Sequence, residues 1–208
     1  MRRFRVIGSS LAALGALLLI VAAAHRATGI RAQAGGFPPL PASSPSPPSS
    51  PSSASFPPPL ERKAPASGDA LGRLEIPRVG LAAIVFEGDS EAILRKGPGH
   101  VPGTAWPADI EAKPGNCVIA GHRDSFFRVL RDAREGDLVR LVDASGTRSY
   151  RLESKRVVSP GDVSVMGATP DARLTLITCY PFHWIGAAPS RLVWSAIPIA
   201  PELDAASR

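Results

Sequence analysis

The chain has 208 residues, with 24 Lys and Arg against 18 Asp and Glu, 22 Pro and 2 Cys. This length allows one domain with appendages, since globular domains average roughly 150 residues. Two cysteines are too few for a disulfide-framework miniprotein or a four-cysteine zinc site. The net charge is +6, but residues 71–200 carry only +2 of it, so a basic surface that binds nucleic acid is not expected.

Residues 1–31 are predicted to hold a short cytoplasmic stub and a membrane anchor. Arginines at positions 2, 3 and 5 precede Val6–Ala24, a run of 19 residues without charge. A span needs about 20 apolar residues, and basic residues before it stay in the cytoplasm. A cleaved signal peptide is the alternative, although its apolar region is usually about 7–15 residues long. We expect a single-pass protein of the cell membrane with its folded part outside the cytoplasm.

Residues 32–69 are predicted to be a disordered linker. This stretch is rich in Pro, Ser, Ala and Gly, and 11 of the 22 prolines lie between Pro38 and Pro65. Such a composition cannot bury enough apolar surface to fold, and it favours extended, partly polyproline II chain. The linker would hold a domain some distance from the membrane. Residues 201–208 are predicted to be a short disordered tail.

Residues 70–200 have the composition of one globular domain. Short runs rich in Val, Ile and Leu alternate with turn sequences, which is typical of an all-β barrel or sandwich. The expected strands are Gly72–Ile76, Ala82–Phe86, Cys117–Gly121, Leu138–Val142, Ser149–Val158, Leu174–Cys179 and Leu192–Ile197. The only expected helices are short, at Ser90–Arg95 and Phe126–Arg134.

Three residues of this domain form a candidate catalytic set. Cys179 ends an apolar strand just before Pro181, His122 follows another strand, and Arg191 begins the last one. A nucleophilic thiolate needs a proton partner and a cationic donor for the oxyanion that develops. A barrel can bring the ends of different strands together, so these residues could form one site.

Two alternatives remain open from the residues alone. An exported protein with two cysteines could pair them, and a disulfide between Cys117 and Cys179 would remove the nucleophile. Cys117 and His122 are five positions apart, so along a regular strand they would point to opposite faces, which disfavours that disulfide. His183 competes with His122 as the base, because positions 179 and 183 share a face if the chain stays extended.

The chain resembles the sortases, the membrane-anchored cysteine transpeptidases of bacterial surfaces. Thr175–Cys179 reads TLITC and matches their TLxTC signature. Further segments resemble the class D sortases in particular: Cys179–Phe182, Ala188–Arg191, Lys96–His100 and Gly121–Phe127. The resemblance covers about residues 71–197 and implies a closed eight-stranded barrel.

The resemblance also implies the roles of individual residues. Cys179 would be the nucleophile, His122 the acid and base, and Arg191 the residue that stabilises the substrate and the oxyanion. Thr178 and His100 are expected to bind substrate. The resemblance gives no role to Cys117.

The implied reaction is a ping-pong acyl transfer through a thioester on Cys179. The partners would be exported proteins with a Leu-Pro-x-Thr-like C-terminal sorting signal and an amine acceptor, either a cell-wall peptide or a protein lysine. No cofactor is expected, and the scattered acidic residues predict no metal site. Two other functions remain: a non-catalytic β domain stapled by a disulfide, and a cysteine peptidase that only hydrolyses.

Overall fold

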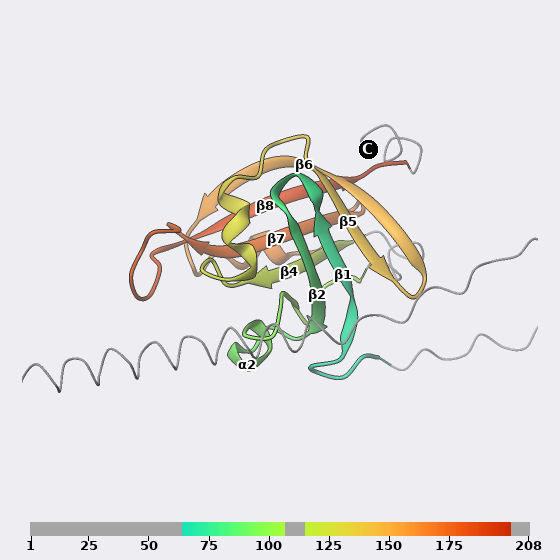
Figure 1. Cartoon of the computed structure of the whole chain (residues 1–208), viewed down its shortest axis with the longest axis horizontal. Coiled ribbons are helices and arrows are strands. Elements are labelled where there is room, and N and C mark those ends of the chain that lie inside the picture. The colour runs from blue at the N-terminus through green and yellow to red at the C-terminus, as the bar shows by residue number, and fades with distance from the viewer. Residues whose placement is uncertain (1–63, 107–114, 201–208) are drawn as a thin grey trace, which may run out of the picture.

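A computed structural model describes residues 64–106 and 115–200 (Figure 1). The predicted membrane span at 6–24, nearly all of the predicted linker and the tail at 201–208 lie outside the described residues. In the two ranges that are described, no helix is long and apolar enough to cross a membrane. The structure therefore tests the prediction for the folded domain at residues 70–200.

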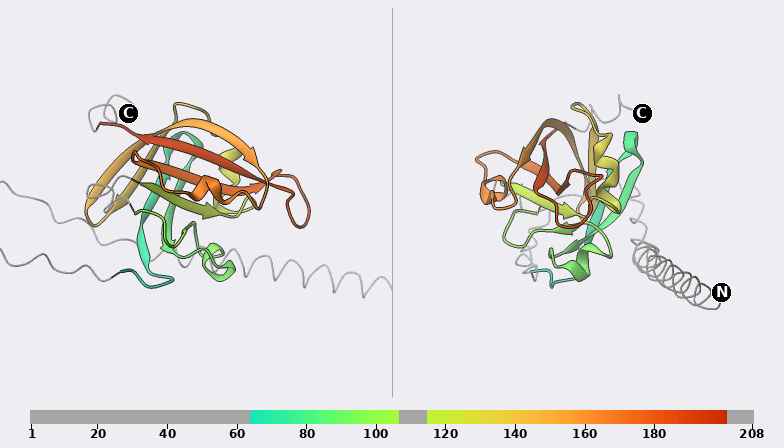
Figure 2. Two further views of the ribbon diagram at one scale, coloured as in Figure 1. Left: turned by 180° about the vertical axis from the view of Figure 1, so that it is seen from behind. Right: turned by 90° about the vertical axis from the view of Figure 1, so that its left-hand side faces the viewer.

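Eight strands close into one barrel, in the order β1-β2-β3-β4-β7-β8-β6-β5 (Figures 1 and 2). The strands are β1 (Ala70–Ile76), β2 (Leu81–Glu87), β3 (Gly99–His100), β4 (Asn116–Gly121), β5 (Leu138–Asp143), β6 (Gly146–Val158), β7 (Arg173–Tyr180) and β8 (Ser190–Pro198). Neighbours are antiparallel except for the parallel pairs β2–β3 and β4–β7. The all-β, eight-stranded barrel expected from the sequence is confirmed.

Helical structure is sparse in the described residues. It consists of helix α2 (Glu91–Leu94) and three 3-10 turns, η1 (Pro77–Val79), η2 (Phe126–Arg131) and η3 (Val163–Met166). Both expected helices occur, but each is shorter than predicted, and the second is a 3-10 turn. The seven expected strands all occur, while β3 was missed because a strand of two residues is too short to show an alternating pattern.

Local sequence explains the turns of two hairpins, β1–β2 and β5–β6. Pro77 opens η1 between β1 and β2, and Gly80 ends it with φ 70°, a left-handed conformation that glycine adopts without strain. Between β5 and β6, the Asp143 carboxylate accepts a hydrogen bond from the Ser145 backbone N–H at 2.7 Å. This is an Asx turn, so the polar residue that ends β5 also starts the return strand.

The core fills the inside of the barrel. Along β7 and β8 the inward side chains alternate with outward ones, so Leu174 and Leu176 lie beside their partners Ala196 and Trp194 on the inner face. Burying each large apolar side chain contributes about 1.5–3 kcal/mol. Turn η2 packs against this core, because Phe127 and Leu130 are buried within it. The edge near η2 is where β4 and β7 both end.

Candidate active site

The strand register brings the candidate residues to one edge of the barrel. β4 and β7 are parallel, and their last described pair is Gly121 with Thr178. His122 and Cys179 follow these two residues directly. On the other side of β7, Cys179 lies opposite Arg191 of β8, and residues paired in this way have Cα atoms about 4.5–5.5 Å apart.

Gly121 allows the sharp turn that follows β4. A Cβ atom at this position would lie 2.7 Å from the ring of Phe127, too close for any other residue. The Phe127 N–H donates to the His122 carbonyl at 3.2 Å, so η2 folds back directly after His122. The histidine is therefore fixed at the barrel edge by the core packing of its own turn.

His122, Cys179 and Arg191 line one open cleft of about 260 Å³. The rest of its wall comes from Arg123 and Asp124, which follow His122, and from Gly186, Ala187 and Ala188 of the loop between β7 and β8. The Cys179 thiol is free and half-buried. A thiol, an imidazole and a guanidinium facing one cleft are the groups that nucleophilic acyl transfer requires.

Arg191 is held at the cleft by backbone carbonyls. Its Nη1 donates to the Ser190 carbonyl at 3.0 Å and to the Ala188 carbonyl at 3.3 Å. Both bonds use the same nitrogen, so the orientation of the planar fork is set while Nε and Nη2 still carry donors of their own.

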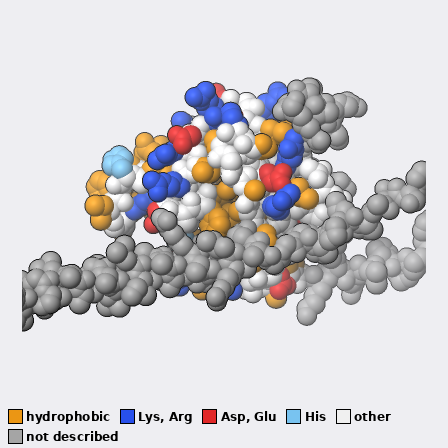
Figure 3. All heavy atoms as spheres, viewed as in Figure 1, with side chains coloured by type: hydrophobic (Ala, Val, Ile, Leu, Met, Phe, Trp, Pro, Cys, Tyr) orange, Lys and Arg blue, Asp and Glu red, His pale blue; other side chains and the backbone are white. Residues whose placement is uncertain are grey.

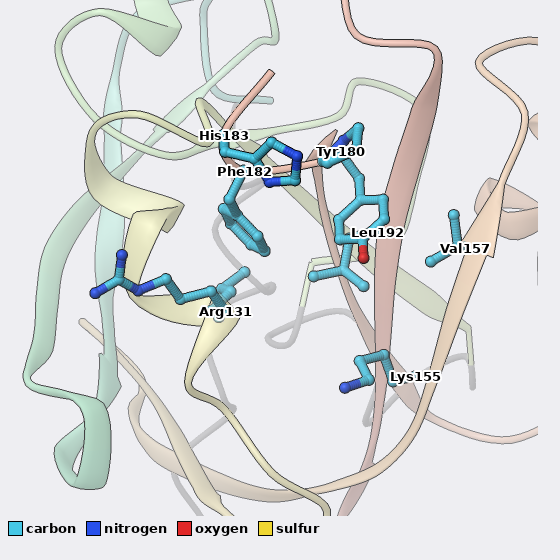
Figure 4. Close-up of a pocket in the computed structure, with 9 residues that line it drawn as sticks. Arg131, Lys155, Val157, Tyr180, Phe182, His183 and Leu192 are labelled. Atoms are coloured by element: carbon cyan, nitrogen blue, oxygen red, sulfur yellow. The ribbon is translucent and has the colours of Figure 1, made fainter.

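His183, the rival base, belongs to a different pocket. It lines a cavity of about 290 Å³ together with Tyr180, Phe182 and Leu192, while Cys179 does not line that cavity. Figure 4 shows His183 above Phe182 at the rim of this pocket, with Leu192 beside them. Because Tyr180 and Leu192 are the neighbours of Cys179 and Arg191 on their strands, the pocket lies on the opposite face of β7 and β8 from Cys179 and Arg191.

Comparison with known proteins identifies the family. Residues 74–199 match the family model of the sortase domain. The chain belongs to the sortase family. Among curated proteins it is 34% identical to Sortase D of Bacillus subtilis (strain 168) over 130 residues, which are 62% of this chain and 64% of that protein. It is 32% identical to Sortase A of Listeria monocytogenes over 113 residues, 52% of this chain and 49% of that protein.

Solved sortase structures share the fold of this sortase. A Clostridium perfringens Sortase D5 transpeptidase superposes with a TM-score of 0.59 at 25% identity, over 66% of this chain and 84% of that one. Sortase C from Clostridium perfringens SM101 gives a TM-score of 0.57 at 27% identity, over 65% and 73%. The matched part spans less than two thirds of each curated relative named above.

The two residues expected to bind substrate are placed elsewhere. Thr178 is buried, and its hydroxyl donates to the Gly121 carbonyl at 2.7 Å, so it joins the ends of β4 and β7. His100 is also buried and lies 2.7 Å from the Glu87 carboxylate, with its other ring nitrogen 3.0 Å from the Thr104 hydroxyl. Neither side chain is among those that line the cleft. A role of either residue in binding substrate therefore stays a prediction.

The disulfide alternative does not fit the register. Cys117 pairs with Leu174 on β7, five residues before Cys179, so the two cysteines are roughly 16 Å apart along the strand. A disulfide requires Cα atoms within about 7 Å. Both cysteines are free, and Cys117 is fully buried in the core. The stapled domain is thereby excluded.

Sequence reasoning missed two residues that contact this site. Glu91 on α2 places a carboxylate oxygen 3.5 Å from His122 Nε2. Arg123 lines the cleft and donates to two loop carbonyls. Arg123 could have been found from its position beside His122, whereas nothing in the sequence indicates that α2 reaches His122. In residues 64–106 and 115–200, no three His, Cys, Asp or Glu side chains gather into a possible metal site.

Proposed function

We propose that this sortase is a cysteine transpeptidase that cleaves a Leu-Pro-x-Thr-like sorting signal and transfers the acyl group to an amine. The observation that carries the proposal is the pairing of Cys179 with Arg191 across β7 and β8, with His122 on the same cleft. Family membership supports the same chemistry.

The reaction divides among the three side chains. His122 takes the thiol proton of Cys179, Sγ attacks the carbonyl carbon of the scissile peptide bond, and the Arg191 guanidinium donates to the oxyanion that forms. As the C–N bond breaks, His122 gives a proton to the departing amine and a thioester remains on Cys179. An incoming amine loses its proton to His122 and attacks the thioester, which releases the thiol.

An apolar floor beside the nucleophile suits the proposed peptide. Side chains two residues apart on a strand share a face, so Ile177 points to the same side as Cys179. Ile177 pairs with Ala120 of β4, and both are partly exposed. This small apolar surface fits the Leu and Pro of a sorting signal better than charged residues.

We also propose that the chain is held in the membrane by residues 6–24, with the domain outside the cytoplasm. The arginines before this run and its length support the proposal. A membrane-tethered enzyme would meet exported substrates that carry a C-terminal sorting signal. The acceptor would be an amine of a cell-wall peptide or of a protein lysine.

The test is an incubation of the domain, residues 64–208, with Leu-Pro-x-Thr peptides, followed by intact mass measurement. We expect an acyl-enzyme mass and, when triglycine or a lysine derivative is added, a ligated peptide. Hydrolysed peptide with no ligated product at any amine concentration would assign a peptidase that only hydrolyses. Absence of both adduct and cleavage over a library of such peptides would contradict the proposal.

A further inference from the structure

The loop between β7 and β8, residues 181–189, joins two parts of the proposed site. It starts after Cys179 and Tyr180 and ends just before Ser190 and Arg191, and it supplies three of the residues that line the cleft. In Figure 1 it projects from one end of the barrel. The position of this loop therefore decides the shape of the cleft.

Apolar burial does not fix the tip of this loop. Ile185 is 96% exposed and Trp184 is 46% exposed, and hydrophobic side chains show at this end of the surface in Figure 3. Inside the loop, the Trp184 indole donates to the Ala187 carbonyl at 2.9 Å. That bond shapes the tip but does not connect it to the barrel, so the connection must come from elsewhere.

Arg123 makes that connection from the opposite side of the cleft. Its Nη2 donates to the Trp184 carbonyl and to the Gly186 carbonyl, both at 2.8 Å. The two acceptors flank the exposed Ile185, so one guanidinium holds the loop tip by its backbone. Hydrogen bonds from a charged donor are shorter and stronger than neutral ones.

We propose that Arg123 is a positioning residue of the transpeptidase, and this inference rests on the proposed function. Arg123 follows His122, and the loop leads to Arg191, which itself binds the Ala188 carbonyl of the loop. The loop is thus held by one arginine from the β4 side and another from the β8 side. Arg123 thereby keeps the loop wall of the cleft, and with it Arg191, at a constant distance from His122.

The geometry favours arginine over lysine at this position. Two carbonyls two residues apart can be bound together by a planar guanidinium, which keeps its donors in a fixed arrangement. A lysine ammonium is a flexible point charge, and it would hold the loop less rigidly. Arg123→Lys should therefore retain part of the effect, whereas Arg123→Ala should lose it.

The experiment compares Arg123→Ala, Arg123→Lys and Arg128→Ala with the unchanged domain. Arg128 is an exposed arginine of η2 that does not line the cleft, so it controls for the loss of a nearby charge. Hydrogen exchange of residues 181–190 measures the loop without any substrate. Peptide ligation measures kcat and KM, and the thermal midpoint measures the fold.

We expect amides of the loop to exchange about tenfold faster or more in Arg123→Ala, because local opening becomes easier. The kcat/KM should fall about tenfold to a hundredfold, since small misplacement of reacting groups costs this much. Most of the loss should appear in KM, because the substrate must then order the loop. Arg123→Lys should be intermediate, and Arg128→Ala should match the unchanged domain.

Two results would overturn the proposal. The first is that hydrogen exchange of the loop is unchanged in Arg123→Ala. The second is that the loop of Arg123→Ala exchanges faster while its kcat/KM equals that of the Arg128→Ala control. If the unchanged domain ligates and cleaves no peptide, the proposed function fails. Loop exchange then still decides whether Arg123 holds the loop.

Discussion

The two ends of the β4–β7 strand pair each hold one cysteine, and the two thiols differ in burial and in the side chains around them. At one end Cys117 is fully buried in the core, and burial, with a smaller contribution from Glu87, raises the pKa of its thiol. At the other end Cys179 lies on an open cleft with His122 and Arg191. A buried thiol far from cationic groups is inert, whereas a thiol beside an imidazole and a guanidinium can be activated. Position along one strand pair therefore decides which cysteine can act.

Substitution of each cysteine by alanine should give the largest difference in kcat/KM between the two sites. Cys179→Ala should remove acyl-enzyme formation and lower kcat/KM by about 10⁴ or more, since loss of a nucleophile has this effect. Cys117→Ala should keep kcat/KM and cost about 1 kcal/mol of stability, because it removes one buried atom from the core. Peptide ligation and urea unfolding of both variants measure the two effects. Equal losses of kcat/KM would contradict the assignment.

Alkylation should separate the two thiols without any substrate. In the folded domain we expect iodoacetamide to modify Cys179, while Cys117 reacts at least about 10³ times more slowly because it is exposed only by large-scale opening. The protection should persist at pH 9, since the raised pKa of Cys117 keeps its thiol neutral where an ordinary thiol ionises. Mass spectrometry of tryptic peptides measures both rates.

Unfolding in urea supplies the control, and both cysteines should then react at similar rates. Rapid modification of Cys117 in the folded domain would show that the core is open there. A mass two hydrogens short, with no alkylation after unfolding, would show the disulfide that the register excludes.

His122 and His183 allow a second comparison, between the cleft that contains Cys179 and the pocket on the opposite face of β7. His122→Ala should lower kcat/KM by about a hundredfold to ten-thousandfold, the contribution typical of a general acid and base. His183→Ala should change it less than about threefold, since His183 lines the pocket on the opposite face of β7 from Cys179. Steady-state ligation kinetics of both variants measure this. A larger loss for His183→Ala would reassign the base.

Substitution of Arg191 measures how far kcat/KM depends on the planar geometry of the guanidinium and not on its charge alone. Arg191→Lys keeps the positive charge but loses the fork whose Nη1 binds two carbonyls. We expect kcat/KM to fall about tenfold to a hundredfold, less than the full loss of an oxyanion donor. The measurement is ligation kinetics with the thermal midpoint as control. Near-normal turnover would argue against a role at the oxyanion.

How much the sequence predicts depends on whether a feature is local. The strand runs and the strand-end positions of Cys179 and Arg191 follow from patterns of a few residues, and the structure bears them out. The choice between His122 and His183 does not, because the chain leaves the strand after Tyr180.

Contacts between distant segments could not be predicted from the sequence, because they depend on how the folded chain brings those segments together. Glu91 approaches His122 only because α2 lies near the end of β4 in the folded chain. His100 and Thr178 are predicted to bind substrate, and no local pattern shows that both side chains are buried and hydrogen-bonded within the protein. Side-chain direction at strand ends depends on packing that no local pattern records.

The smallest expected effect compares two threonines of β7 that each bond to β4. Thr178 donates to the Gly121 carbonyl beside the cleft, and Thr175 donates to the Asn116 side chain at the far end, both at 2.7 Å. Thr178→Val and Thr175→Val should each cost about 1–3 kcal/mol, because each leaves a buried acceptor without its donor. Only Thr178→Val should also lower kcat/KM, by about threefold to tenfold, since it loosens the strand end that carries Cys179. Urea unfolding and ligation kinetics separate the two quantities. An equal loss of kcat/KM in both variants would mean that the general stability of the barrel, rather than the position of its catalytic end, limits turnover.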